Sequence, residues 1–325
     1  MSAAVARALL AVKPRGIVPW GPLLTFGMLV ALFVTDLLLQ PALADWNQIG
    51  LEIGNALPLV LLGFAQTLVV LVRGIDLSVG GTLAVANVLT ATWIGASDGR
   101  LDLLLVVLLI GLGMGALNGV LVTFMDFQPF VATLATWSVY GGIALWVLPT
   151  DGGAPPPRLT SVVTGTIGAV PTTYVILAGI LLVWVWLKGT TFGRAIYAIG
   201  SDEESANLNG VRIRAVKVTV YALAGLAAAA AGIYLAGQNS TGTPTIGNGL
   251  ILRSVAVVVI GGTSLLGGRG GVVLTTMAAF VLTLIDDVVS AQNLSVWVGA
   301  AADAGLLLVI VGTRSFIELR RSIER

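Results

Sequence analysis

Residues 102–124 read DLLLVVLLIGLGMGALNGVLVTF, a run whose only charged residue is the Asp102 that opens it. An apolar helix of about 20 residues is long enough to cross the hydrocarbon core of a bilayer. Glycine and alanine within such a run are typical of helices that pack closely together in a membrane. The stretch therefore predicts a transmembrane helix.

Similar apolar runs recur along the whole chain. With the first they number about ten, with ends defined to within about four residues, and they lie at 17–39, 53–72, 76–96, 102–124, 129–149, 169–187, 216–237, 250–266, 271–291 and 295–313. The 325 residues are 57% hydrophobic and 10% charged, with a mean hydropathy of +0.98, whereas soluble domains carry about 25% charged residues. We therefore expect an all-α, polytopic integral membrane protein that forms a single transmembrane domain over residues 1–325.

The positive charges are distributed unevenly between the predicted loops. Placing the N-terminus in the cytoplasm leaves only Arg100, Arg158 and Arg253, of 17 Lys and Arg residues, on the outer side. Loops rich in Lys and Arg stay on the cytoplasmic side of a membrane, so this arrangement is self-consistent. Both termini are predicted to be cytoplasmic.

The first apolar run has some features of a signal peptide. Arg7, Lys13 and Arg15 precede it, and it ends near Ala42-Leu43-Ala44, which imitates a cleavage site. The run is longer than the core of a signal peptide, which has about 7–15 residues. We therefore expect an uncleaved first helix.

The composition removes several classes of function. A net charge of +1 provides neither the basic patch that nucleic acid requires nor a strongly acidic surface. The absence of Cys and His removes disulfides, Ser-His and Cys-His catalytic pairs, and the usual zinc and haem ligands. No cofactor or metal is expected, and the chain is predicted not to be an enzyme, although an active site of carboxylates or lysine alone stays open.

Two segments are too polar to cross a membrane. Residues 150–170 are rich in Pro and Gly and predict a periplasmic loop, whereas residues 188–217 form the longest polar stretch and are predicted to be cytoplasmic. In the latter, Ser201 can N-cap a short helix, the acids at 202–204 suit its positive end, and Gly210 can end it. The segment is either a solvated connector or a coupling helix that fits a groove on a partner.

A glycine-rich junction, GIDLSVGG at 74–81, precedes the third apolar run. Its glycines permit tight turns, and Asp76 or Ser78 can cap the helix that follows. Capping alone would explain these residues. The alternative is that a broken helix places free amide groups and a carboxylate beside a permeation route.

The run GGTSLLGG at 261–268 resembles this junction. Two similarly oriented halves would form a parallel repeat about a pseudo-two-fold axis along the membrane normal, and the competing interpretation is that tight glycine-rich loops look alike. The glycine run at 261–271 lacks the Gly-Lys-Ser/Thr ending of a phosphate-binding loop. The chain itself is therefore not expected to hydrolyse ATP.

Polar residues within apolar runs are further candidates for function. Gln66 and Asn87 could offer hydrogen bonds in a pathway or could bridge two helices. Asp286 and Asp287 either sit at the outer end of their helix or face water or a partner, because a buried carboxylate costs at least a few kcal/mol. Asp303 lies deeper, which favours a cavity-facing or paired role, although no obvious Lys or Arg partner within the membrane is seen in the sequence.

Four motifs occur in order along most of the chain: the junction at 74–80, PFVATLAT at 129–136, FGRAIYAIG at 192–200, and VIGGTSL at 259–265 with GGRG at 267–270. At these residues the chain resembles the permease subunits of bacterial ATP-binding-cassette (ABC) importers of the ribose, xylose and galactose type. The resemblance implies a helical permease in the bacterial inner membrane that pairs with a second permease copy. It also implies two ATPase subunits docked on the inner segment, a periplasmic substrate-binding protein, and a monosaccharide as substrate.

The chain departs from the family's usual pattern at four places. The family usually has a small Ala-Ala pair at Glu204-Ser205, an acidic segment at 250–253, an Asn pair near Asp286-Asp287, and often a basic residue near Asp303. Apart from the first, these departures lie in the last helices. They bear on the substrate more than on the fold, so an unusual monosaccharide or another small polar solute is conceivable.

The predicted sites fall into two groups. The ATPase-coupling residues are predicted to be Gly193, Arg194, Tyr197, Asp202, Glu203, Glu204, Leu208 and Gly210, and the translocation-pathway residues Gln66, Gly74, Asp76, Ser78, Asn87, Thr133 and Asp303. The alternatives are a permease of the same architecture for branched-chain amino acids or nucleosides, a proton-coupled carrier that uses Asp303, and an intramembrane enzyme.

Overall fold

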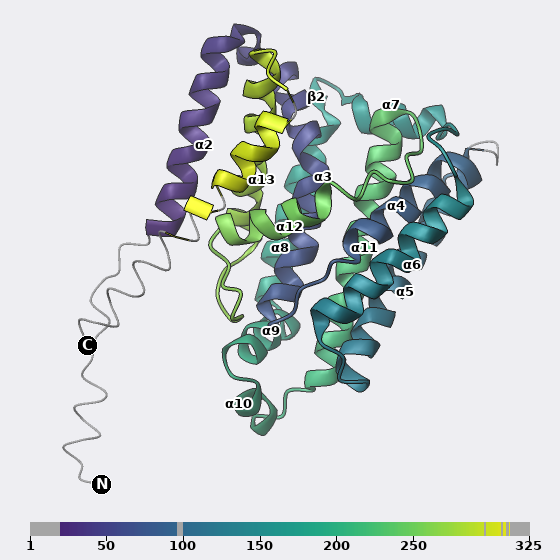
Figure 1. Ribbon diagram of the computed structural model, residues 1–325, viewed down its shortest axis with the longest axis vertical. Coiled ribbons are helices and arrows are strands. Elements are labelled where there is room, and N and C mark those ends of the chain that lie inside the picture. The colour runs from purple at the N-terminus through teal and green to yellow at the C-terminus, as the bar shows by residue number, and fades with distance from the viewer. Residues whose placement is uncertain (1–19, 96–99, 296, 307, 310–311, 313–325) are drawn as a thin grey trace.

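The computed structural model describes residues 20–95, 100–295, 297–306, 308–309 and 312, which form a bundle of helices (Figure 1). The all-α, polytopic prediction is confirmed. The helices are α2 (Trp20–Leu39), α3 (Trp46–Leu71), α4 (Val79–Leu89), α5 (Leu103–Phe124), α6 (Pro129–Val147), α7 (Pro157–Thr164), α8 (Thr172–Gly189), α9 (Thr191–Ser201), α10 (Glu203–Leu208), α11 (Ile213–Asn239), α12 (Leu250–Ile260) and α13 (Val272–Ala291). A 3-10 turn covers Pro41–Ala44, and strands β1 (Thr166–Ile167) and β2 (Val170–Pro171) form a hairpin.

Seven of the described helices are long and apolar enough to cross a membrane, namely α2, α3, α5, α6, α8, α11 and α13. Two predicted spans are shorter than expected. The run 76–96 holds α4 and a π-helical end at Thr90–Ile94, and the run 250–266 holds only the 11 residues of α12. The last predicted span, 295–313, lies partly outside the described residues.

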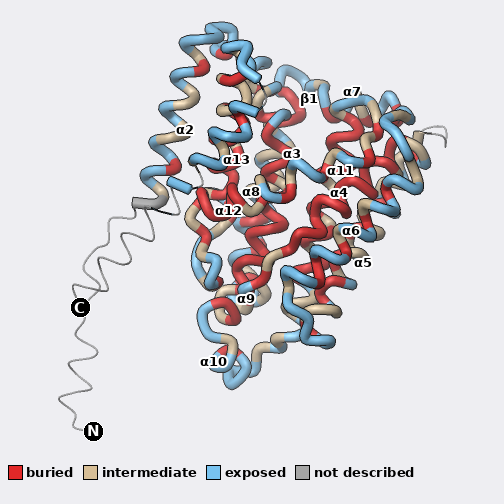
Figure 2. The backbone as a smooth tube through the Cα atoms, viewed as in Figure 1, coloured by how far each residue is buried: buried red, intermediate tan, exposed pale blue. Residues whose placement is uncertain are grey.

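The centre of the bundle is built on α3 and α11, which are the most buried of the seven long helices, and on the short α4, which is buried along nearly all its length (Figure 2). Small residues let α5 lie directly against α11. A methyl group on Gly225 would stand 2.8 Å from the backbone nitrogen of Gly115, so both positions require glycine. Without a hydrophobic driving force between helices in lipid, this close backbone packing is a main source of helix association.

The two short helices, α4 and α12, point their N-termini at each other. The irregular segment 74–78 leads from the end of α3 into the start of α4, and residues 240–249 lead from α11 into α12 (Figure 1). At the meeting point, a methyl group on Gly80 would stand 2.9 Å from the carbonyl oxygen of Gly247. The two backbones are therefore in contact, and irregular backbone lies inside the protein, where it is tolerated.

The polar segments are more structured than the sequence indicated. Residues 150–170 hold α7 and β1, and Gly152 pairs with Gly242 through two backbone hydrogen bonds. Residues 188–217 hold two short helices, α9 and α10, instead of one. The end of the bundle that carries them is called the inner end below, because the charge distribution predicts that it faces the cytoplasm.

Candidate translocation and coupling site

The junction at 74–78 is held by a buried hydrogen-bond cluster around Asp76. The Asp76 carboxylate, which is fully buried, accepts hydrogen bonds from the backbone amide of Ser78 at 2.9 Å and from its hydroxyl at 2.6 Å. The Asn118 side-chain amide, on α5, donates to the Ser78 hydroxyl oxygen at 2.6 Å. Ser78 is thus the N-cap residue of α4 without a capping hydrogen bond from its own side chain, and Asp76 holds it in place.

Thr133, in the first turn of α6, joins this cluster from the other side. Its hydroxyl oxygen accepts a hydrogen bond from the backbone amide of Leu77 at 3.1 Å and donates to the carbonyl of Pro129 at 2.7 Å. Three of the predicted pathway residues, Asp76, Ser78 and Thr133, thus meet at one point. They fix the position of an irregular backbone segment that has no ladder of its own.

Gln66 and Asn87 lie apart from that cluster. Asn87, on α4, donates to the carbonyl of Gly232 at 3.2 Å and accepts from the amide of Thr243 at 2.7 Å, so it bridges two segments. Gln66 is fully buried on α3, and neither of its amide atoms has a hydrogen-bond partner among the described residues. An unpaired buried amide costs about 1–3 kcal/mol, which makes Gln66 the better candidate for contact with a passing solute.

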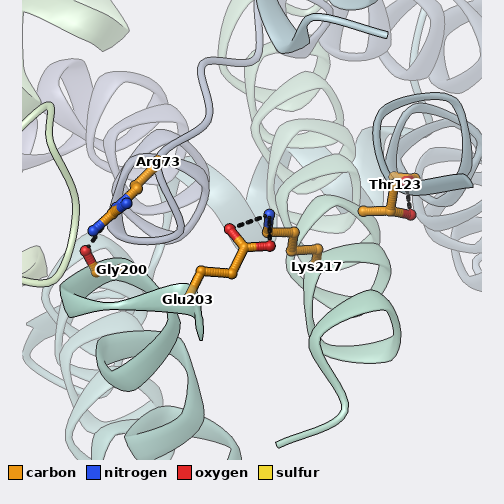
Figure 3. A network of polar contacts seen from close by, with 6 residues as sticks. Arg73, Thr123, Gly200, Glu203 and Lys217 are labelled. Carbon is orange, nitrogen blue, oxygen red and sulfur yellow. Dashed lines mark hydrogen bonds and ion pairs between the residues drawn. The ribbon is translucent and has the colours of Figure 1, made fainter. Parts of the chain in front are cut away.

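A cavity of about 330 Å³ opens below the junction at the inner end. The buried Gly74 and Tyr221 line it, together with the exposed Arg73 and the pair Glu203 and Lys217. The Lys217 ammonium donates to both Glu203 carboxylate oxygens at 2.7 and 2.8 Å, which ties α10 to α11 (Figure 3). A wider groove of about 1100 Å³ adjoins this cavity and continues along α10 to the end of α5.

The helix α9 joins the two glycine-rich loops. The Arg73 guanidinium, in the loop after α3, donates to the carbonyl of Gly200 at 2.9 Å (Figure 3). It also donates to the carbonyl of Ser201 at 2.9 Å. The loop after α12 joins the same place, because the Gly268 amide donates to the carbonyl of Leu71 at 3.1 Å. The two loops that resemble each other in sequence are therefore neighbours at the inner end.

Tyr197 provides a further link from α9. Its hydroxyl donates to the carbonyl of Gly270 at 2.7 Å. Gly193 lies against the end of α8, and Arg194 donates to the carbonyl of Gly189 at 3.0 Å. These three predicted coupling residues thus anchor α9 to the end of α8 and to the loop after α12.

The cap of α10 corrects one prediction. Asp202, not Ser201, is the N-cap, and its carboxylate accepts from the amide of Ser205 at 2.9 Å, while Ser201 ends α9. The Ser205 hydroxyl donates to the same carboxylate at 2.9 Å, and the two hydrogen bonds from Ser205 hold the pKa of Asp202 below its usual value. Gly210, with a φ of 82°, follows the end of α10, as predicted from its freedom to adopt left-handed conformations.

Three predicted coupling residues differ in what they present to a partner. Glu204 is exposed and Leu208 is 82% exposed, whereas Glu203 is engaged by Lys217 within the chain. An apolar side chain this exposed at the polar end of a membrane protein is a feature of interaction surfaces. Leu208 is therefore the clearest candidate for contact with a partner.

At the opposite end, a cavity of about 390 Å³ lies between α3, α11, α12 and α13. Its lining residues are Asn55, Pro58, Leu59, Leu235, Ile246, Gly249, Leu250, Arg253, Thr283, Asp286 and Asp287. We call it the outer cavity. Its floor, at Gly249 and Leu250, adjoins the contact between Gly80 and Gly247, so that contact separates it from the junction at 74–78.

Asp303 has a basic partner that the sequence did not reveal. The Arg253 guanidinium makes ion pairs with Asp286 at 2.7 Å and with Asp303 at 3.0 Å. The expectation that Asp303 lacks a Lys or Arg partner is wrong, because Arg253 sits one turn into α12 and faces inward. Asp303 therefore lies beside the outer cavity, away from Asp76.

Several residues of the site were missed from the sequence. In the sequence, Arg73 and Lys217 counted only as positive charges, and Gly200 only as part of the motif at 192–200. The contact between Arg73 and Gly200 joins residues more than a hundred positions apart. The ion pair of Lys217 with Glu203 depends on the turn between α10 and α11. Asn118 could have been noted as a polar residue in the otherwise apolar run 102–124. Its hydrogen-bond partner, Ser78, could not have been identified from the sequence.

Comparison with known proteins places this geometry in context. The family model described as "Branched-chain amino acid transport system / permease component" matches residues 52–311. The chain is 32% identical to a ribose import permease protein of Haemophilus influenzae, covering 80% of this chain and 83% of that protein, and 37% identical to one of Bacillus subtilis, covering 70% and 72%. It is 35% identical to an autoinducer 2 import system permease protein of Yersinia pseudotuberculosis, covering 82% and 76%. No solved structure matches the chain.

Proposed function

The chain belongs to the family of branched-chain amino acid transport system permease components, an ABC importer permease family, and from this premise we propose that it is the membrane subunit of an ATP-driven importer of a monosaccharide. It is a transporter permease, and its relatives import ribose or autoinducer 2. In the proposal, two ATPase subunits bind at the inner end, a second permease copy completes the pathway, and a periplasmic protein delivers the solute.

The observation that carries the proposal is the position of α9. It contacts the loop that leads into α4 through Arg73 and the loop after α12 through Tyr197 and Gly200. A displacement of α9 and α10 would therefore move both loops together. These helices and loops would form one element with an inward-facing and an outward-facing state. ATPase binding from inside and solute delivery from outside would both shift the equilibrium between the two states, as alternating access requires.

The pathway in this proposal runs along α3 between the two cavities. The outer cavity and the inner cavity are separated by the Gly80 to Gly247 contact and the Asp76 cluster. Gln66 lies on α3 between Leu59 of the outer cavity and the helix end at Leu71, about 10 Å along the axis from Leu59 at a rise of about 1.5 Å per residue. While this contact is closed, a solute cannot pass between the outer and the inner cavity.

The outer cavity offers a monosaccharide both polar and apolar contacts. Its lining includes Asn55, Thr283 and three charged groups beside apolar side chains such as Leu59 and Leu235. The family's printed description names branched-chain amino acids, and the three relatives named above carry ribose or autoinducer 2 in their names. The sugar assignment follows those relatives.

The experiment is co-purification of the full chain with an ABC ATPase encoded beside its gene. Leu208→Glu places a charge on the docking surface without touching an internal contact, and we expect it to abolish the complex. Ile167→Glu is the matched control, because Ile167 is 60% exposed on the hairpin away from the inner end. Glu203→Arg is a poor probe, since it would break the internal ion pair with Lys217.

The two outcomes separate the proposal from its main rival. Loss of the complex in Leu208→Glu with retention in Ile167→Glu supports ATPase docking on α10. If no neighbouring ATPase binds the wild-type chain, ATP-driven import is rejected, and uptake driven by a proton gradient in proteoliposomes becomes the next measurement.

A further inference from the structure

The outer cavity carries an unusual balance of charge. Arg253, Asp286 and Asp287 line it, and Glu52 and Asp303 stand directly behind the lining. Glu52 lies close enough to Asp287 for a direct electrostatic interaction. Two ionised carboxylates this close repel each other unless a proton or a cation lies between them.

Acceptors also outnumber donors around this cavity. Asp36, on α2, is fully buried, lies close enough to Glu52 and Asp287 for a direct electrostatic interaction, and keeps one carboxyl oxygen that no donor among the described residues reaches. One carboxyl oxygen of Asp303 is likewise buried without a donor among the described residues. Arg253 is the one base among these six groups, so a net negative charge remains even when Glu52 and Asp287 share a proton.

The start of α12 contributes an opposing field that is too weak to reverse this balance. A helix N-terminus is equivalent to about half a positive charge, and its effect falls off within the first turn. The short α12 begins at Leu250, on the floor of the cavity. Half a charge does not offset the excess of carboxylates.

We propose that the outer cavity binds a polyhydroxylated solute that carries a primary ammonium group, held by the carboxylates of Asp286 and Asp287. The inference rests on the proposed permease function and names its substrate class. Hydroxyls of the solute would pair with Asn55 and Thr283, and its apolar ring face would lie on Pro58 and Leu59. The volume of about 390 Å³ lies within the range of about 300–1000 Å³ typical of small-molecule sites.

The departures noted in the sequence acquire one explanation in this proposal. The acidic pair at 286–287, the Arg253 that replaces an acidic segment, and Asp303 are far apart in the chain and converge on one cavity. Arg253 pairs with Asp286 and Asp303, and the carboxylates of Asp286 and Asp287 face the cavity, where they would receive the cation. A neutral sugar would leave their charge unsatisfied.

The test is equilibrium binding of D-glucosamine, D-glucose and D-glucuronate to the purified full chain in lipid nanodiscs. These probes differ chiefly in charge. We expect glucosamine to bind at least about tenfold more tightly than glucose, and glucuronate to bind least. Asp287→Asn, which keeps the shape of the side chain, should lower the glucosamine preference at least threefold while glucose still binds.

The control is Asp102→Asn, which removes an exposed carboxylate that pairs with Arg100 away from the cavity. It should leave the preference unchanged. Asp286→Asn is a second variant in case Asp287→Asn fails to fold, and it should lower the preference in the same direction. Equal or tighter binding of glucose by the wild type, no binding of any probe, or a preference that survives both variants would overturn the inference.

Failure of this inference is distinguishable from failure of the permease proposal. ATPase co-purification does not depend on the charge of the solute. A chain that binds its ATPase but prefers glucose remains a permease with a neutral substrate, whereas a chain that prefers glucosamine without any ATPase partner would retain the cavity assignment and lose the coupling mechanism.

Discussion

Gly268 is the position at which the coupling geometry can be tested most directly. It has a φ of 68°, and a methyl group there would stand 2.6 Å from both the backbone nitrogen and the hydroxyl oxygen of Ser201 and 2.8 Å from the carbonyl carbon of Gly200. Real side-chain carbons keep at least about 3 Å from such atoms, and two of these three atoms belong to backbone that cannot rotate away. Gly268→Ala must therefore push α9 away from the loop.

The magnitude has two parts. A positive φ costs an alanine about 1 kcal/mol, and overpacking against backbone adds about 1–3 kcal/mol. At about 2 cal/mol/K of unfolding entropy per residue, each kcal/mol lowers the Tm of this chain by about 1.5 °C. The expected fall in Tm is about 3–6 °C.

Gly168→Ala is the matched control, because Gly168 has a φ of 64° with nothing within 4 Å of an added methyl group. It carries the backbone strain without the overpacking, so its Tm should fall by only about 1.5 °C. The assays are thermal unfolding of the purified chain and ATP-driven solute uptake by the full complex. Equal Tm values and equal uptake in the two variants would refute the claim that α9 is packed against this loop.

Two further predictions follow from the junction and from α10. Thr133→Val should lower stability by about 1–3 kcal/mol, because it leaves the buried amide of Leu77 without an acceptor; Thr133→Ser should restore thermal stability, and an equally stable valine variant would contradict the bond's role. The pKa of Asp202 is lowered in the folded chain, so its cap is fully formed above about pH 4 and weakens as pH falls through the folded pKa. The protection factors of the α10 amides, which correct for the intrinsic pH dependence of hydrogen exchange, should fall below about pH 4 in the wild type. Asp202→Asn should abolish this fall, and a variant that still loses protection would assign the effect elsewhere.

Much of the architecture was available from the sequence because the bilayer makes one requirement dominant. A chain that crosses lipid must satisfy its backbone within helices, so the apolar runs alone indicated an all-α membrane protein. The glycine junction at 74–81 was also recognised as a helix break, since glycine and a capping residue have local signatures. The length of the helix that follows was not predicted. α4 and α12 are as apolar as helices that cross the whole membrane, and the sequence does not show at which residue their helical backbone begins.

Some residues of the candidate site could likewise be identified from the sequence, and others could not. Gly210, Asp76 and the exposed part of the 188–217 segment could be identified because each acts on backbone within a few residues of itself. The cap at Asp202 was misplaced by one residue, since Ser201 and Asp202 are both good N-caps and only the end of α9 decides between them.

What only the tertiary structure decided is which distant residues share a site. Arg73 meets Gly200, and Arg253 meets Asp286 and Asp303, through contacts that span long stretches of chain. In the sequence these residues are isolated charges in or near apolar runs. Helix composition specifies that a segment lies in the membrane, whereas the rotation and depth of each helix, and so the direction of each polar side chain, depend on packing against its neighbours.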